Sequence, residues 1–194
     1  MTMTHAIPTV MDPDDAAMRQ VAAGDTGALA VLFERHKGRL LGYLCRILGD
    51  PSTAEDLLGE TFLRVYRARE RFISGSPFLP WALRIARNLA IAEIRRRTVS
   101  LRTWQRLFAR SVWEEAPPEP GQGELERRVQ AALMRLPEDQ RSVVVLKEYL
   151  GLAYSDIGRI VGCSEEAARA RSYRARASLR RELAGWWEEN GGRL

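Results

Sequence analysis

Apolar residues recur every three or four positions along most of the chain, and this spacing constrains the fold more than any other feature. Between residues 29 and 47 the recurring residues are Leu29, Leu32, Phe33, Leu40, Leu41, Leu44 and Ile47. This rhythm places an apolar stripe on one face of an α-helix. The sustained alternation of a β-strand is absent, and the β-branched run at 142–146 keeps the helical spacing. We therefore predict an all-α fold.

Turn-forming residues divide this helical pattern. Gly49-Asp50-Pro51 ends the first long helix, Ser52 or Thr53 can cap the next one, and a third helix begins near Pro80. The segment 114–121 contains three prolines and cannot continue a helix. We predict two small helical domains joined by a flexible linker: a disordered N-terminal tail at 1–13, where Pro8 and Pro13 oppose helix formation, a first domain at 14–98, a linker at 99–124, a second domain at 125–184 and a C-terminal tail at 185–194.

Positive charge is concentrated in two places. The 194-residue chain has a formal net charge of +5. Residues 84–110 contain eight arginines and one acid, and residues 169–181 contain six arginines and no acid. A protein that touches DNA at two sites needs such a distribution, because arginine neutralises phosphate.

Several other classes are not favoured by the sequence. No run of 18 apolar residues and no secretory signal is present, so we expect a cytoplasmic protein. Cys45 and Cys163 are expected to be reduced, and His5 and His36 lack metal-ligand spacing. No catalytic constellation appears. We predict no enzyme activity, no catalytic residue, no metal or other cofactor and no small-molecule substrate.

The segment from Tyr154 onward has the pattern of a helix-turn-helix. A short helix at 154–161 is followed by Gly162, a residue type that ends helices in the left-handed conformation. Ser164 can cap the next helix. Gly158 stands four residues before Gly162, where a small residue lets two helices approach closely. The second helix of such a motif enters the major groove of DNA.

The second helix carries a stripe of Arg169, Tyr173 and Arg176 at three- and four-residue spacing. Arginine pairs with guanine edges or phosphates. The alternative is a solvated arginine-rich face. A helix-turn-helix alone does not separate a repressor from an initiation factor.

Four segments, in this order, resemble the extracytoplasmic-function sigma factors, the group IV bacterial sigma factors that carry only the second and fourth conserved regions. These segments are 54–63, 81–88, 136–141 and 174–176. The resemblance covers residues 14 to 183. It implies a factor that binds core RNA polymerase, recognises upstream and downstream promoter elements and promotes DNA melting. It also implies an anti-sigma partner. For the upstream element, the implied DNA contacts are Tyr154, Glu165, Arg169, Ala170, Tyr173, Arg174 and Arg176.

The resemblance identifies the helix near 54–63 as the polymerase-binding helix, which contacts the β′ clamp helices. Its acidic and apolar residues suit a basic partner. The alternative is an ordinary amphipathic helix with a solvated acidic edge. The implied contacts are Asp56, Leu57, Glu60, Phe62, Leu63 and Tyr66.

The stretch 81–88 is similar to the part of the family that melts and reads the downstream element. Aromatic, cationic and amide groups together suit single-stranded DNA. The alternative is that Trp81 is core and the arginines are solvated. By resemblance, a flipped base enters a pocket rimmed by the loop from Arg71 to Pro80, and Arg97 joins its neighbours on the DNA backbone. The implied contacts are Ala68, Phe72, Arg84, Ile85, Arg87, Asn88, Arg95 and Arg96.

The sequence departs from the family at a few positions. Gly59 lies within the polymerase-binding helix, and Ala167 and Ala168 replace the usual threonine and valine. The promoter sequence is therefore not inherited from relatives. The runner-up function is a stand-alone helix-turn-helix regulator of duplex DNA, and a nucleic-acid enzyme is a weaker third.

Overall fold

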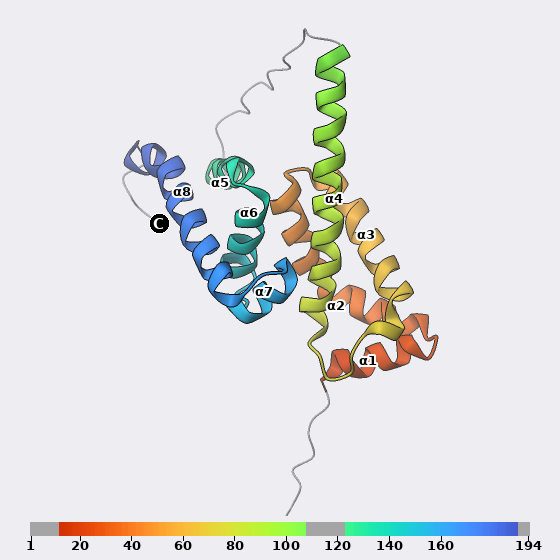
Figure 1. Cartoon of the computed structure of the whole chain (residues 1–194). Helices are drawn as coiled ribbons and strands as arrows, with labels where there is room; N and C mark the ends of the chain where they lie inside the picture. Colours follow the sequence, from red (N-terminus) through yellow and green to blue (C-terminus); the bar gives the residue numbers. More distant parts are fainter. Residues whose placement is uncertain (1–11, 108–122, 190–194) are drawn as a thin grey trace, which may run out of the picture.

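The chain forms two helical domains that lie side by side (Figure 1). The computed structural model describes residues 12–107 and 123–189, and all regular structure within them is helical. The all-α prediction is confirmed. The first domain contains α1 (Pro13–Ala22), α2 (Thr26–Leu48), α3 (Pro51–Arg67), the 3-10 turn η1 (Arg69–Arg71) and α4 (Phe78–Leu107). The second contains α5 (Glu124–Arg135), α6 (Glu138–Val144), the π-helical turn η2 (Val145–Tyr149), α7 (Tyr154–Val161) and α8 (Glu165–Glu189).

Aspartate caps and prolines set where two of these helices begin. Asp12 caps α1 by accepting a hydrogen bond from the Asp14 backbone N–H, and Pro13, expected to oppose the helix, is its first residue. Asp50, rather than Ser52 or Thr53, caps α3. Proline is favoured at the first helical position because its missing N–H would lack a partner there anyway. Residues 1–11 of the predicted tail lie outside the described residues.

Two helices extend beyond the predicted domain boundaries. The helix α4 continues to Leu107, through nine residues assigned to the linker, because the sequence from 81 to 107 contains neither proline nor glycine. The helix α8 continues to Glu189, and Gly185 alone does not end it. The rest of the predicted linker, 108–122, and of the C-terminal tail, 190–194, lies outside the described residues.

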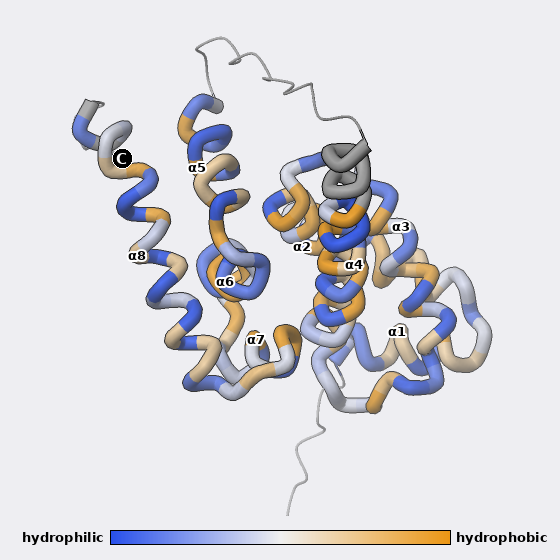
Figure 2. Tube along the Cα trace, turned by 45° about the horizontal axis from the view of Figure 1, so that its top comes forward, coloured by the Kyte–Doolittle hydropathy of each residue, from blue (hydrophilic) through white to orange (hydrophobic). Residues whose placement is uncertain are grey.

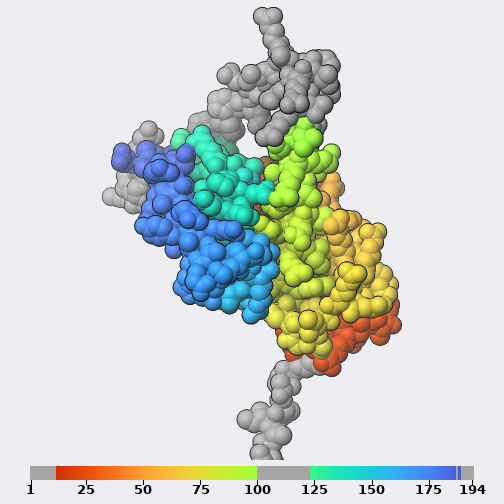
Figure 3. Space-filling model, in the orientation of Figure 1, coloured from red at the N-terminus to blue at the C-terminus, as the bar shows by residue number. Residues whose placement is uncertain are grey.

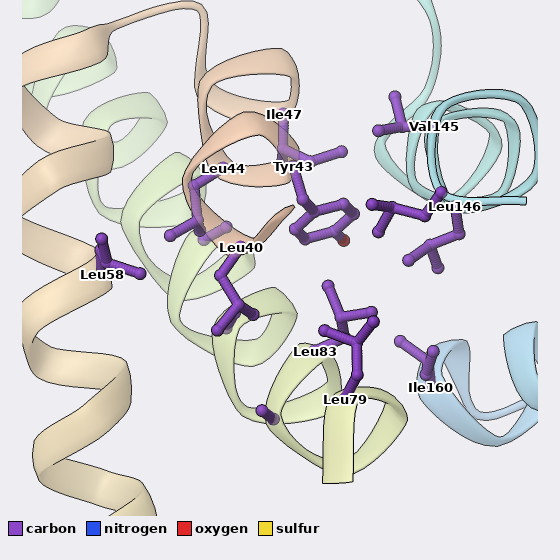
Figure 4. Close-up of a cluster of buried hydrophobic side chains, with 14 of the residues drawn as sticks. Leu40, Tyr43, Leu44, Ile47, Leu58, Leu79, Leu83, Val145, Leu146 and Ile160 are labelled. Carbon is purple, nitrogen blue, oxygen red and sulfur yellow. The ribbon is translucent and has the colours of Figure 1, made fainter. Parts of the chain in front are cut away.

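The two domains share one continuous hydrophobic core. In the first domain, α2, α3 and α4 pack around Leu40, Leu44 and Leu58 (Figure 4). Leu79 and Leu83 of α4 and Ile160 of α7 belong to this same buried cluster, which crosses the domain boundary. Figure 2 shows apolar residues at the end of α7 that lies toward α4, and Figure 3 shows the second domain against α4. Burial of these side chains favours the closed arrangement.

Polar contacts reinforce the domain contact. Arg141, on α6, is buried and donates to the carbonyl oxygens of Ile47, Met134 and Leu136 at 2.6, 3.0 and 3.0 Å. Desolvation lowers the pKa of its guanidinium. These bonds tie α2 of the first domain to the second domain.

Tyr149 packs directly against Gly42 of α2, and a side chain at position 42 would require Tyr149 to move. A Cβ atom on Gly42 would lie 2.1 Å from the Tyr149 Oη. The Arg46 guanidinium lies 3.7 Å from the centre of the Tyr149 ring, a cation–π arrangement. Because Gly42 has no side chain, Tyr149 of the second domain can lie directly against α2 of the first.

Candidate nucleic-acid and polymerase interfaces

The helix-turn-helix has the predicted geometry. Gly162 adopts φ +80°, and its N–H donates to the Gly158 carbonyl at 2.8 Å. A Cβ on Gly158 would lie 2.7 Å from the Cys163 carbonyl oxygen, so the close approach of the turn requires glycine there. The Ser164 hydroxyl caps α8 by accepting from the Ala167 N–H at 3.2 Å. The turn that presents α8 is thus fixed by local residues.

One side of α8 is exposed and the opposite side is buried. Ala168 and Ala175 are buried against the domain core. Tyr173 is 70% exposed, although it is aromatic, which leaves its ring open to a partner. The remaining predicted contacts on this exposed side are Arg169, Ala170, Arg174 and Arg176.

Intramolecular contacts hold several of the predicted upstream residues. Arg169 pairs with Glu165 at 2.6 Å and lies 4.9 Å from the Tyr154 ring centre. The Tyr154 hydroxyl donates to the Ser172 Oγ at 3.2 Å, so Tyr154 is partly buried beside the recognition helix. Arg176 lies 3.7 Å from Glu148. These contacts pre-position Arg169 at the start of α8 and Arg176 near its middle.

A cationic hollow lies between the end of α3 and α4. Its volume is about 390 Å³. Three of the predicted downstream residues line it: Ala68, Ile85 and Asn88. Arg71, predicted at the rim of the pocket, lines the hollow as well. Sequence reasoning missed the remaining two lining residues, Arg64 and Arg67, which are three residues apart on α3. The hollow thus combines an amide, an apolar wall and three cations.

Phe72 does not line this hollow. The centre of its ring lies 5.2 Å from that of Trp81, in an edge-on arrangement, and 6.4 Å from that of Phe78, in a tilted one. Trp81 is partly buried in the same cluster. Arg84 is exposed on α4, and no ion pair of Arg84 occurs in the described part of the chain. Phe72 therefore packs within an aromatic cluster and does not face the hollow.

Arg87 and Arg95 are paired with the second domain in this structure. Arg87 is 9% exposed, and its Nη2 lies 2.5 Å from the Asp139 Oδ1. The other oxygen of Asp139 lies 3.6 Å from the Nη2 of Arg171, on α8. Arg95 lies 3.3 Å from Glu138. In this closed arrangement Arg87 is not presented to DNA, because it is buried and its guanidinium pairs with Asp139; its contact with DNA stays a prediction.

The arginines at the middle of α4 also have acidic partners. Glu93 accepts from both Arg96 and Arg97, and Asp50 accepts from Arg97 at 2.9 Å. Hydrogen bonds from Arg96 and then Arg97 lower the pKa of Glu93 to about 2. Hydrogen bonds from Thr53 and then Arg97 lower the pKa of Asp50 to about 2. Arg97 therefore ties α4 to the start of α3, whereas Arg96 remains largely exposed.

The outward face of α3 carries acidic and apolar groups. Asp56, Glu60 and Leu63 point away from the core, and Leu63 is 53% exposed. Glu60 pairs with Arg64 at 2.9 Å. Asp56 makes no ion pair with any described residue. Asp56 is thus the carboxylate on this face that is free to meet a partner.

Three predicted polymerase contacts are packed within the domain. Phe62 is 5% exposed and meets the Phe33 ring edge-on at 4.9 Å. Phe62 belongs to the buried stripe of α3, so this structure does not present it to a partner, and its contact with polymerase stays a prediction. Leu57 and Tyr66 are partly buried against the core, and the Arg69 guanidinium lies 4.5 Å from the Tyr66 ring.

Other chemical features are sparse in the described part of the chain. Cys45 and Cys163 are free thiols. No group of three or more potential metal ligands occurs within residues 12–107 and 123–189. No helix among these residues is long and apolar enough to cross a membrane.

The comparisons with known proteins match both domains. The family model for Sigma-70 region 2 matches residues 32–99, and that for Sigma-70 region 4 matches residues 126–179. The chain is 37% identical to the RNA polymerase sigma factor CarQ of Myxococcus xanthus, over 87% of this chain and 95% of that protein. It is 30% identical to the ECF RNA polymerase sigma factor SigW of Bacillus subtilis, over 86% of this chain and 94% of that protein. The chain belongs to the extracytoplasmic-function family of RNA polymerase sigma factors.

Solved structures of sigma factors have the same fold. The sigma factor RpoE of Bartonella quintana, in complex with the anti-sigma factor NepR, has a TM-score of 0.67 and 26% identity, over 80% of this chain and 96% of that one. CnrH, in complex with the cytosolic domain of CnrY, also has a TM-score of 0.67, with 28% identity over 90% and 99%. The predicted sigma-factor function is confirmed, and the stand-alone regulator is not favoured.

The functional regions of this sigma factor correspond to the features described above. The region 2 match contains the α3 face and the cationic hollow, and the region 4 match contains the helix-turn-helix. Sigma factors are DNA-binding transcription initiation factors, a class distinct from classical enzymes. The helix α1 precedes the region 2 match.

Proposed function

We propose that this sigma factor divides promoter recognition between its two domains. Region 4 binds duplex DNA of the upstream element through α8, and region 2 holds a melted downstream strand at the cationic hollow. Core RNA polymerase binds the outward face of α3. The observation that carries this proposal is the presence in one chain of a helix-turn-helix and a separate hollow lined by Asn88 and three arginines.

The start of α8 reads the upstream element. Arg169 and Tyr173 are exposed one turn apart, so both reach the same groove. Glu165 holds Arg169 in place until a guanine edge or a phosphate replaces it. Ala170 permits close approach, and Arg174 and Arg176 contact the flanking phosphates.

The hollow in region 2 accepts an unstacked base of the downstream element. Asn88 offers both a hydrogen-bond donor and an acceptor to a base edge, and Ile85 offers an apolar wall. Arg64, Arg67 and Arg71 surround the hollow with positive charge for the backbone, and Arg84 extends it along α4. Trapping a flipped base offsets the cost of unstacking it and holds the strand open.

Release of region 4 from region 2 exposes the remaining DNA contacts. Arg87 and Arg95 are held by Asp139 and Glu138 in the closed arrangement. They reach DNA when the domains separate on polymerase. RpoE and CnrH, the similar sigma factors, were solved in complexes with NepR and with the cytosolic domain of CnrY. We extend this to the present chain: an anti-sigma factor binds it in the cytoplasm, where polymerase acts, and withholds these surfaces.

The upstream assignment is tested by Arg169→Ala and Tyr173→Ala. Arg169→Ala is expected to weaken holoenzyme binding to an upstream-element duplex about tenfold or more, because a bidentate base contact contributes about 1–3 kcal/mol. Tyr173→Ala should weaken it as well, because the exposed ring that can contact the groove is lost. Binding to core polymerase stays unchanged. Fluorescence anisotropy with a labelled duplex and with labelled polymerase measures the two affinities.

Arg181→Ala is the matched control for these two variants. It removes one exposed arginine from the same helix, twelve residues or about 18 Å further along. Its effect on the upstream duplex should be small. An equal loss in Arg181→Ala, or a loss of polymerase binding in Arg169→Ala, would contradict the division of labour.

A further inference from the structure

A buried carboxylate of α1 holds the loop between η1 and α4. Asp15 is 3% exposed, and its Oδ1 accepts a hydrogen bond from the Gly75 backbone N–H at 2.8 Å. Its Oδ2 accepts from the Ser74 hydroxyl at 3.0 Å and from the Arg19 guanidinium at 2.9 Å. Arg19 in turn donates to the Ser74 Oγ through Nε at 3.0 Å and Nη2 at 2.7 Å. The side chains of Asp15, Arg19 and Ser74 thus contact one another, and Asp15 also holds the Gly75 N–H, although α1 and the loop lie about 60 residues apart.

These bonds fix the central residues of a tight turn. The Ser76 N–H donates to the Ile73 carbonyl at 3.0 Å, which closes a turn over residues 73–76. Gly75 has φ +82°, the left-handed conformation that a type II turn requires at this position. Four-residue turns at the surface are mobile unless other groups hold them. Asp15 supplies that anchor from another helix.

In the sequence, the anchored turn closely follows residues that line the cationic hollow. Arg71, which lines the hollow, stands two residues before Ile73. Ile73 is 74% exposed, an unusual environment for a large apolar side chain. Phe72, between them, packs on Phe78 and Trp81 and so ties the turn to the start of α4. The turn begins two residues after Arg71, so its position constrains both Arg71, which lines the hollow, and the exposed side chain of Ile73.

We propose that Asp15 is a positioning residue for downstream-element recognition, which acts by holding the 73–76 turn so that Ile73 and Arg71 close over the flipped base. This inference rests on the proposed function of the hollow. It extends the base-recognition site to α1, which lies before the region 2 match. The role of Asp15 differs from that of the lining residues, since Asp15 itself touches no DNA.

The test uses holoenzyme on a promoter fragment that it transcribes, with an abasic nucleotide placed in turn at each downstream position of the non-template strand. Open complexes are quantified by permanganate footprinting. With the wild-type protein, the amount of open complex should fall most when the abasic nucleotide replaces the base that is flipped into the hollow. Asp15→Ala should form at least about tenfold less open complex on the intact promoter, because hydrogen bonds to a charged group are lost. On the fragment that is abasic at the flipped position, Asp15→Ala and wild type should be equal.

Asp14→Ala is the matched control. Asp14 is the neighbouring carboxylate on α1, but it pairs with Arg35 and His36 on α2 and does not contact the loop. Asp14→Ala should form as much open complex as wild type on the intact promoter and on every abasic fragment. Asp15→Asn keeps one acceptor oxygen for the Gly75 N–H and should fall between wild type and Asp15→Ala.

Two outcomes would overturn the inference while leaving the proposed function intact. One is an Asp15→Ala loss that persists unchanged on the abasic fragment, which indicates a general folding defect. The other is an Asp15→Ala variant that equals wild type on the intact promoter. A wild-type protein with no position-specific abasic loss would instead refute the base-binding hollow itself, and the role of Asp15 with it.

Discussion

The Asp56→Arg variant is expected to bind core RNA polymerase at least about 100-fold more weakly than wild type, because like charges opposed at an interface cost several kcal/mol. Asp56 points outward from α3, and it makes no ion pair within the described residues, whereas Glu60 is held by Arg64. Its carboxylate is therefore available to a basic partner surface. Fluorescence anisotropy with labelled sigma factor and unlabelled core polymerase measures the affinity.

Glu34→Arg provides the control for Asp56→Arg. Glu34 is an exposed carboxylate on α2 that pairs with Lys37 at 2.6 Å, and its replacement makes the same change in net charge. This variant should bind polymerase with nearly wild-type affinity. Equal weakening by both substitutions would indicate a general charge effect, and the proposed role of the α3 face would then be wrong.

The Gly158→Val variant is expected to lower the free energy of unfolding of region 4 by about 3 kcal/mol or more, the upper end of the cost of overpacking. The added Cβ would lie 2.7 Å from a backbone oxygen, that of Cys163, which cannot move without opening the helix-turn-helix. Upstream DNA binding should be lost together with stability. Urea denaturation followed by circular dichroism measures the change.

Gly59→Ala is the matched glycine substitution. Gly59 lies on the exposed side of α3, and a Cβ there would have no neighbour within 4 Å. Alanine should raise the free energy of unfolding by about 0.5–1 kcal/mol, because it loses less backbone entropy in a helix. Stability of Gly158→Val equal to that of wild type would mean that the turn around Gly162 is not as tight as described.

The helix-turn-helix could be predicted from sequence because its determinants are local. Gly158, Gly162 and Ser164 lie within seven residues, and each acts on its immediate neighbours. The same reasoning chose the wrong cap for α3. Asp50 was taken as part of the preceding turn, although aspartate followed by proline is itself a strong start signal.

The burial of Phe62 was also within reach of the sequence. It shares a helical face with Leu58 and Val65, which are buried, so its spacing marks it as core. Its assignment to the polymerase face followed the resemblance, which identifies the polymerase-binding helix. The resemblance does not say which side of that helix is exposed and which is buried. Arg64, four residues before Ala68, and Arg67, three residues after Arg64, could likewise have been found by helical spacing.

The pairing of Arg87 with Asp139 could not be predicted. The two residues are 52 positions apart and belong to different domains, and nothing local to either one specifies how the domains pack. The contact of Tyr149 with Gly42, and that of Asp15 with the 73–76 turn, could not be predicted for the same reason. Contacts of this kind depend on the assembled shape of the molecule.

The most direct test of the account is run-off transcription with purified sigma factor, bacterial core polymerase and fragments of the genome that encodes the chain. The account predicts discrete transcripts that appear only when the sigma factor is added, and that disappear with Asp56→Arg. Absence of such transcripts, together with a sigma factor that fails to comigrate with core polymerase, would contradict the central claim that this chain directs polymerase to promoters.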